Sequence, residues 1–132
     1  MQRLRAFWQR RLARMHRDDG ISTLEFFVLA PILLIVLCAA VQMGIWYLGD
    51  AAAATAARKG AETGSSYQST PAEGAARAHR WLAGIGIVRD VNVSTAGSTG
   101  EKVQITVDAQ VMNFLPFLDI SIHRSAEDIV EQ

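Results

Sequence analysis

The chain has 132 residues and a formal net charge of zero, and half of its residues are hydrophobic. This length allows one small domain at most, and the single cysteine, Cys38, excludes an intrachain disulfide. The charge is unevenly distributed, because residues 1–20 contain six arginines and two aspartates whereas the remainder is net acidic. The basic N-terminal segment therefore needs an explanation of its own.

An apolar run, residues 26–49, follows the basic segment and reads FFVLAPILLIVLCAAVQMGIWYLG. It contains no charged residue, and Gln42 is its only strongly polar one. About 20 helical residues cross a bilayer core of roughly 30 Å, so the run predicts a single transmembrane helix. Arginine-rich flanks stay in the cytoplasm, and tryptophan and tyrosine favour the headgroup layer. This predicts a cytoplasmic N-terminus and places Trp46 and Tyr47 at the outer end of the helix.

A soluble helix and a signal peptide are less favoured interpretations of the apolar run. A buried helix of a soluble protein is not expected to be so long and so free of charge. A secretory signal peptide has an apolar core of about 7–15 residues. The alanine cluster at residues 51–57 nevertheless offers a small-residue cleavage site for such a peptide.

Two features inside the run concern the helix itself. Pro31 removes one backbone donor and is expected to bend the helix, and a neighbouring helix or water can repair that loss in a membrane. Ala40 and Gly44 form a small-residue pair, which suits the close approach of another helix.

The junction between the basic segment and the apolar run holds the most informative residues. The basic segment ends at Gly20, and Glu25 stands alone at the start of the apolar run. A structural interpretation is a capping box, in which Ser22 accepts from the amide of Glu25 while Glu25 reaches back to Ser22. A carboxylate in the first turn also complements the helix dipole. A functional interpretation competes with it, because ionisable groups at membrane depth usually serve a role.

A basic leader, a glycine, four residues, Glu-Phe and a long apolar helix together resemble the type IV prepilin class. Within that class the segment GISTLEFFVLAPILL, with a proline six residues after Glu25 and AARKGA at the helix end, is similar to the TadE family. That family comprises minor pseudopilins of the tight-adherence, or Flp, pilus machinery. The resemblance implies that a membrane prepilin peptidase cuts after Gly20, leaving Ile21 as the new amino terminus. Asp18 and Asp19 make this leader less basic than many leaders of the class.

The resemblance also implies roles for the residues that remain after cleavage. Glu25 becomes the fifth residue of the mature chain, and Glu25 and Phe26 form the assembly and processing motif. In a pilus, Glu25 can pair with the freed amino group of a neighbouring subunit. The implied partners are the prepilin peptidase, other pilin or pseudopilin subunits, assembly-platform proteins and membrane lipid. The implied location is the bacterial cytoplasmic (inner) membrane, crossed once, with the C-terminal domain outside.

Two helical segments are expected beyond the apolar run. The first helix continues through residues 50–64, because alanine is the best helix former, and it ends at Gly60 or Gly64. A second helix is expected over residues 71–83. Its start is marked by the sequence TPAE at residues 70–73, which supplies a cap, a proline at the first position and a glutamate to close the box.

Strand signals fill the C-terminal third of the chain. Residues 102–111 alternate apolar and polar side chains throughout, as a half-buried strand does, and residues 87–94 show the same alternation at Val91 and Val93. A third strand begins at residues 120–124 and is expected to run on towards Val130. The alternation predicts an antiparallel sheet with one face packed on the helices. The apolar segment FLPFL, residues 114–118, is interpreted as either a core plug or a contact surface for a partner or the headgroup layer.

The expected fold class is therefore α+β. A long N-terminal transmembrane helix continues into a small outward domain with a second helix and a roughly three-stranded antiparallel sheet. The expected organisation is a basic prepilin leader (1–20), a transmembrane and stem helix (21–64) and an extracytoplasmic α+β domain (65–132).

No arrangement of side chains predicts catalysis. His16, His79 and His123 lack ligand spacing, and the sequence has no phosphate-binding loop, nucleophile elbow or metal motif. We therefore expect no enzymatic activity, catalytic residue, metal or cofactor. The arginines of the leader are better explained by topology and anionic lipid than by nucleic acid. An alternative function is an uncleaved single-pass accessory protein with an outward binding domain.

Overall fold

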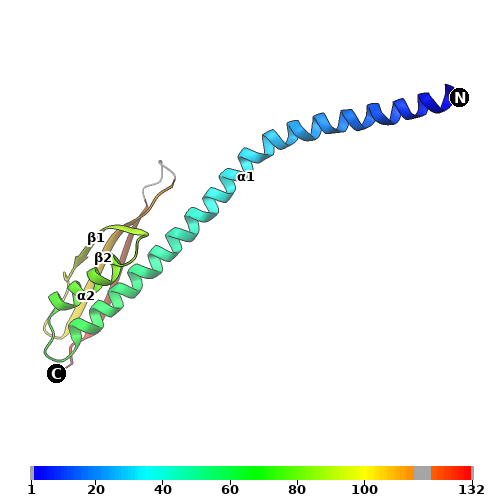
Figure 1. The fold of residues 1–132 in the computed structure, drawn as a ribbon. Helices are drawn as coiled ribbons and strands as arrows, with labels where there is room; N and C mark the ends of the chain where they lie inside the picture. Colours follow the sequence, from blue (N-terminus) through cyan, green and yellow to red (C-terminus); the bar gives the residue numbers. More distant parts are fainter. Residues whose placement is uncertain (1, 115–119, 132) are drawn as a thin grey trace. The chain divides into compact units, whose positions relative to one another are not determined.

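The computed structural model describes residues 2–114 and 120–131, with side-chain surroundings from residue 23 onward. Its elements are α1 (Gln2–Ser65), α2 (Pro71–Ala83), β1 (Val88–Ser94), β2 (Lys102–Val111) and β3 (Ser121–Ile129) (Figure 1). The three strands form an antiparallel sheet in the order β1-β2-β3. The predicted α+β fold is confirmed. The chain divides into two compact units, Met1–Ala40 and Val41–Gln132.

Helix α1 is longer than the sequence indicates. It has 64 residues, includes Pro31 and continues past both candidate end points to Ser65. Gly60 lies inside the helix and Gly64 in its last turn, and both are points of close contact. A Cβ at Gly60 would lie 2.9 Å from the carbonyl oxygen of Gly74, and a Cβ at Gly64 would lie 3.0 Å from a methyl group of Val103. The predicted end at Gly60 is therefore wrong, whereas the predicted end at Gly64 lies one residue before the observed end at Ser65.

Helix α2 begins and ends as predicted. The amide of Thr70 donates to Glu73 Oε2 at 2.9 Å, and the amide of Glu73 donates to Thr70 Oγ1 at 3.3 Å. Pro71 occupies the first turn, and Gly84 is the C-terminal cap. The capping box satisfies backbone donors that the first helical turn leaves unpaired, so this short helix has a well-defined start.

The sheet shows the predicted alternation. Every second residue of β2 is buried, beginning at Val103 and ending at Val111, and β2 pairs with a neighbour on both sides. Strand β1 has a register irregularity between Arg89 and Asn92. Asp90 lies at this irregularity with a φ of 48°, a left-handed conformation that aspartate tolerates better than most residues.

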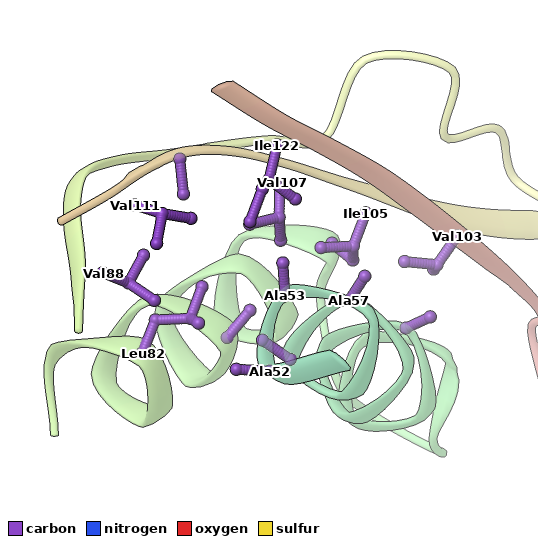
Figure 2. Close-up of a cluster of buried hydrophobic side chains, with 14 residues drawn as sticks. Ala52, Ala53, Ala57, Leu82, Val88, Val103, Ile105, Val107, Val111 and Ile122 are labelled. Carbon is purple, nitrogen blue, oxygen red and sulfur yellow. The ribbon is translucent and has the colours of Figure 1, made fainter. Parts of the chain in front are cut away.

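The core of the second unit lies between the sheet and the two helices (Figure 2). Helix α1 contributes only alanines to the buried cluster, with the half-buried Ile45 packed against it, whereas α2 and the strands contribute larger buried side chains. The buried hydrophobic residues of α1 are Ala52, Ala53, Ala56, Ala57 and Ala61. Leu82, Val103, Ile105 and Val107 are the largest fully buried side chains. Because alanine projects little from a helix, α1 can lie close to both the sheet and α2, and the β-branched residues fill the space.

Strand β2 runs antiparallel to the second half of α1. Near its end, Val111 faces Gly49, while Ile105 faces Gly60 and Val103 faces Gly64. The strand end that follows Val111 therefore lies beside the earlier turns of this half of the helix.

The predicted core plug at residues 114–118 can be assessed only at its first position. Phe114 is 64% exposed, so this side chain does not fill the core. The other four residues lie outside the described part of the chain.

Candidate functional site

The predicted cleavage junction lies within helix α1. The helix passes through Gly20, Ile21, Ser22 and Glu25 without a break. Ser22 therefore does not begin a helix, and the capping-box interpretation of Glu25 is wrong for the uncut chain. Continuity of the helix also means that the bond after Gly20 has helical rather than extended geometry.

Glu25 and Phe26 are both exposed on the helix. Within the residues that the structure describes, Glu25 has no ion-pair partner. Phe26 is 68% exposed and begins a series of uncovered apolar side chains. The junction thus presents a carboxylate directly beside an apolar surface, and neither is covered by the rest of the described chain.

The apolar part of α1 is uncovered on all sides. From residue 24 to residue 41 every side chain is exposed except the half-buried Ala30. A window of this helix has a mean hydropathy of 2.7 and none of it is buried. A helix that is apolar all round needs a nonaqueous environment, and this one is long and apolar enough to cross a membrane. The chain is therefore a single-pass membrane protein, with Pro31 and Cys38 in the apolar segment.

The apolar segment that remains uncovered is shorter than the run seen in the sequence. Gln42 is only 3% exposed, and Gly49 is buried against Val111 and Ile122. The last third of the predicted span is thus partly covered by the folded unit. Residues 24–41 number about 18 and extend over roughly 27 Å at about 1.5 Å per residue.

Gln42, the strongly polar residue of the apolar run, has partners that the sequence does not reveal. Its Nε2 donates to Asn113 Oδ1 at 3.0 Å and to the carbonyl oxygen of Met112 at 3.4 Å. Its Oε1 accepts from the amide of Phe114 at 3.0 Å. A buried amide needs hydrogen-bond partners. The position of Gln42 as the lone strongly polar side chain in an apolar run therefore indicates that such partners exist.

The AARKGA segment, residues 56–61, forms the packing face of α1. Ala56, Ala57, Gly60 and Ala61 are buried, whereas Arg58 and Lys59 point outward. The ammonium of Lys59 lies 5.2 Å from the centre of the Trp81 ring on α2, a cation–π geometry. This motif therefore joins the helix to the folded unit.

An ion pair links the same helix to the edge strand. Arg124 on β3 donates to both carboxylate oxygens of Asp50, with N···O distances of 2.7 and 2.6 Å. The hydrogen bond from Arg124 lowers the pKa of the Asp50 carboxyl, and the same contact raises the pKa of the guanidinium. The bidentate geometry orients β3 relative to α1.

The histidines of the second unit have separate surroundings. His123 Nδ1 contacts Asp108 Oδ1 on the exposed face of the sheet. His79 is exposed on α2. Among the residues described, no group of three or more histidine, cysteine, aspartate or glutamate side chains is placed to hold a metal ion.

Comparison with known proteins finds a family similarity over the junction and much of the helix. The family model described as TadE-like protein matches residues 20–62. No curated protein and no solved structure matches the chain. The match begins at Gly20, includes the uncovered apolar helix and ends just after the packing face, so it confirms the resemblance seen in the sequence. The segment that holds the junction, the apolar helix and the packing face is therefore similar to TadE-like proteins.

Proposed function

We propose that the chain is a minor pilin-like subunit that a prepilin peptidase cuts after Gly20 and that then acts in assembling a tight-adherence, or Flp, pilus or a related secretion apparatus. The role is structural rather than enzymatic. The observation that carries the proposal is the junction, where Gly20 and Glu25 flank the start of an uncovered apolar helix. The family match begins at the same glycine.

The cut requires a local change in α1. Proteases bind an extended backbone, whereas the bond after Gly20 lies in a helix. Glycine weakens a helix by about 1 kcal/mol relative to alanine, and it has no side chain to obstruct an extended conformation. Gly20 is thus suited to both unwinding and cleavage, and the cut removes the arginine-rich leader.

Glu25 serves assembly after the cut. Its carboxylate is exposed beside apolar side chains and has no ion-pair partner in the described chain. The amino group freed at Ile21 of a neighbouring subunit supplies the missing positive charge. In a low-dielectric environment such a pair fixes the register between subunits more than it adds stability.

The proposed orientation follows from the charges. The six arginines of the leader stay on the cytoplasmic side, and the unit that contains α2 and the sheet lies outside the cytoplasmic membrane. The proposed partners are the peptidase, other pilin or pseudopilin subunits, proteins of the assembly platform and membrane lipid.

Intact-mass measurement of the membrane-bound protein tests the cleavage. In a host with the matching peptidase we expect a mature chain that begins at Ile21. Retention of the leader in that host, with the peptidase active on another prepilin, would instead indicate an uncleaved accessory protein.

A further inference from the structure

The contact between Gln42 and the chain that follows β2 fixes part of the folded unit at a defined level of the helix. We call this contact the Gln42 collar and define it as Gln42, Met112, Asn113 and Phe114. Both ends of the Gln42 amide are used, since Nε2 donates to Met112 O and Asn113 Oδ1 while Oε1 accepts from Phe114 N. The side chain is 3% exposed, so the collar is a closed polar contact.

The collar holds an aromatic side chain outward. Phe114 is 64% exposed even though its amide is held by Gln42. On the helix, Met43 is 65% exposed and Tyr47 is 68% exposed. Met43 and Tyr47 lie four residues apart and therefore on one side of the helix, and the amide of Phe114 is already paired, which lowers the cost of entering a poorly hydrated layer.

The position of the collar along the helix identifies what covers this surface. Gln42 directly follows residues 24–41, which extend over roughly 27 Å, close to the roughly 30 Å thickness of a hydrocarbon core. With residues 24–41 in the core, Gln42 lies at its outer boundary. Tryptophan and tyrosine, such as Tyr47, concentrate at that boundary, where the ring is partly dehydrated and its polar group can reach water.

We propose that the Gln42 collar is a membrane-surface contact, in which Phe114, with Met43 and Tyr47, lies in the interfacial layer of the lipid bilayer. The end of β2 that carries the collar then lies at the membrane surface. The proposal depends on the membrane placement of residues 24–41 but not on cleavage or on pilus assembly.

Site-directed spin labelling of the full chain tests this contact. The native thiol is removed by Cys38→Ser, and single cysteines are introduced by Phe114→Cys, Val36→Cys or Ala96→Cys. Each labelled protein is reconstituted at low protein-to-lipid ratio in vesicles of phosphatidylethanolamine and phosphatidylglycerol. Collision rates with oxygen, which enters lipid, and with a water-soluble nickel chelate are then compared. Ala96 is an exposed residue in the turn before β2, at the end of the sheet away from the collar.

The ratio of oxygen to nickel collision rates should increase with the depth of the label in the bilayer. The label at position 36 should favour oxygen most strongly, and the label at position 96 should favour the nickel chelate. The label at position 114 should be intermediate, with an oxygen-to-nickel ratio several-fold above that at position 96. Equal ratios at 114 and 96 would overturn the proposal. Low collision rates with both reagents at 114 would also overturn it, because another copy of the protein would then cover the site.

The ratio at position 36 shows which part of the proposal fails if the expected order is not observed. A water-like ratio at position 36 would refute the membrane placement itself, whereas a lipid-like ratio at 36 with a water-like ratio at 114 would refute only the collar contact.

Because a label could disturb the collar, Phe114→Trp is also made in a chain with Trp8, Trp46 and Trp81 replaced by Phe. Its fluorescence should be quenched by lipids brominated near the headgroup more than by lipids brominated near the bilayer centre, and absence of quenching by both would contradict the proposal.

Discussion

Gly60 and Gly74 bring helices α1 and α2 into backbone contact. A Cβ at Gly60 would lie 2.9 Å from the carbonyl oxygen of Gly74, and a Cβ at Gly74 would overlap the carbonyl oxygen of Gly60. The obstacle in both directions is backbone, which cannot turn aside as a flexible side chain can. These two glycines therefore set the distance between the helices.

Gly74→Ala is expected to destabilise the folded unit. Overpacking costs about 1–3 kcal/mol, which exceeds the gain of about 1 kcal/mol from replacing glycine by alanine in a helix. Denaturant unfolding of the full chain in detergent, followed by near-ultraviolet circular dichroism, measures the difference. Gly86→Ala is the matched control, because nothing lies within 4 Å of a Cβ at that position. Equal stability of the two variants would show that the helices can separate at little cost.

Gly20→Ala is expected to slow or block processing. A side chain at this position obstructs the extended backbone in the peptidase site, and alanine also strengthens the helix that must unwind. Larger side chains at position 20 should slow processing further. The ratio of uncut to cut protein in a time course of synthesis measures the effect. Cleavage at the normal rate with a bulky residue at position 20 would place the cut elsewhere.

Glu25→Ala is expected to leave processing largely intact and to impair pilus formation. Glu25 lies within the mature helix, away from the bond that is cut, and its carboxylate is available to a neighbouring amino group. Glu25→Gln should behave much like alanine, because glutamine has the same shape without the charge. Processed subunit and surface pili are scored in the same strains. Normal piliation with glutamine and loss with alanine would show that hydrogen bonding, rather than charge, is what Glu25 supplies.

The contribution of Asp50 to stability is expected to depend on pH. Its pKa is lowered by the hydrogen bond from Arg124, so the stabilisation is present above the ordinary aspartate pKa of about 4 and is lost as pH falls through the lowered value. Asp50→Asn should reduce stability slightly at pH 7 and have no effect well below the lowered pKa. Unfolding curves at both pH values measure this, with the exposed Glu101→Gln as control. A constant difference across pH would contradict the ionic origin of the effect.

The proposed orientation predicts which introduced cysteines are accessible to a membrane-impermeant thiol reagent. In a chain with Cys38→Ser, a cysteine introduced by Ala96→Cys should react with a membrane-impermeant reagent in intact spheroplasts. A cysteine introduced by Gln2→Cys, in the leader, is expected to react only after lysis when processing is blocked by Gly20→Ala. The reverse pattern would invert the topology.

Elements whose signals are local could be predicted from the sequence. The cap at Thr70 and the alternation from Val103 to Val111 depend on neighbours within a few residues, and both are confirmed. Elements that depend on distant partners could not be predicted. Gly60 is a residue type that often ends helices, but in the structure it lies inside α1, where it contacts the backbone of Gly74. Gln42 has the appearance of a tolerated polar residue in a membrane span, but its partners lie 70–72 residues away in the chain.

The antiparallel course of β2 along α1 has a mechanical consequence. Contacts to Gly49, Gly60 and Gly64 succeed one another along about four turns of helix. A force that pulls the helix along its own axis therefore loads these contacts in shear and at the same time, whereas a sideways force would open them one after another. The folded unit is therefore best able to withstand tension along the axis of this half of the helix.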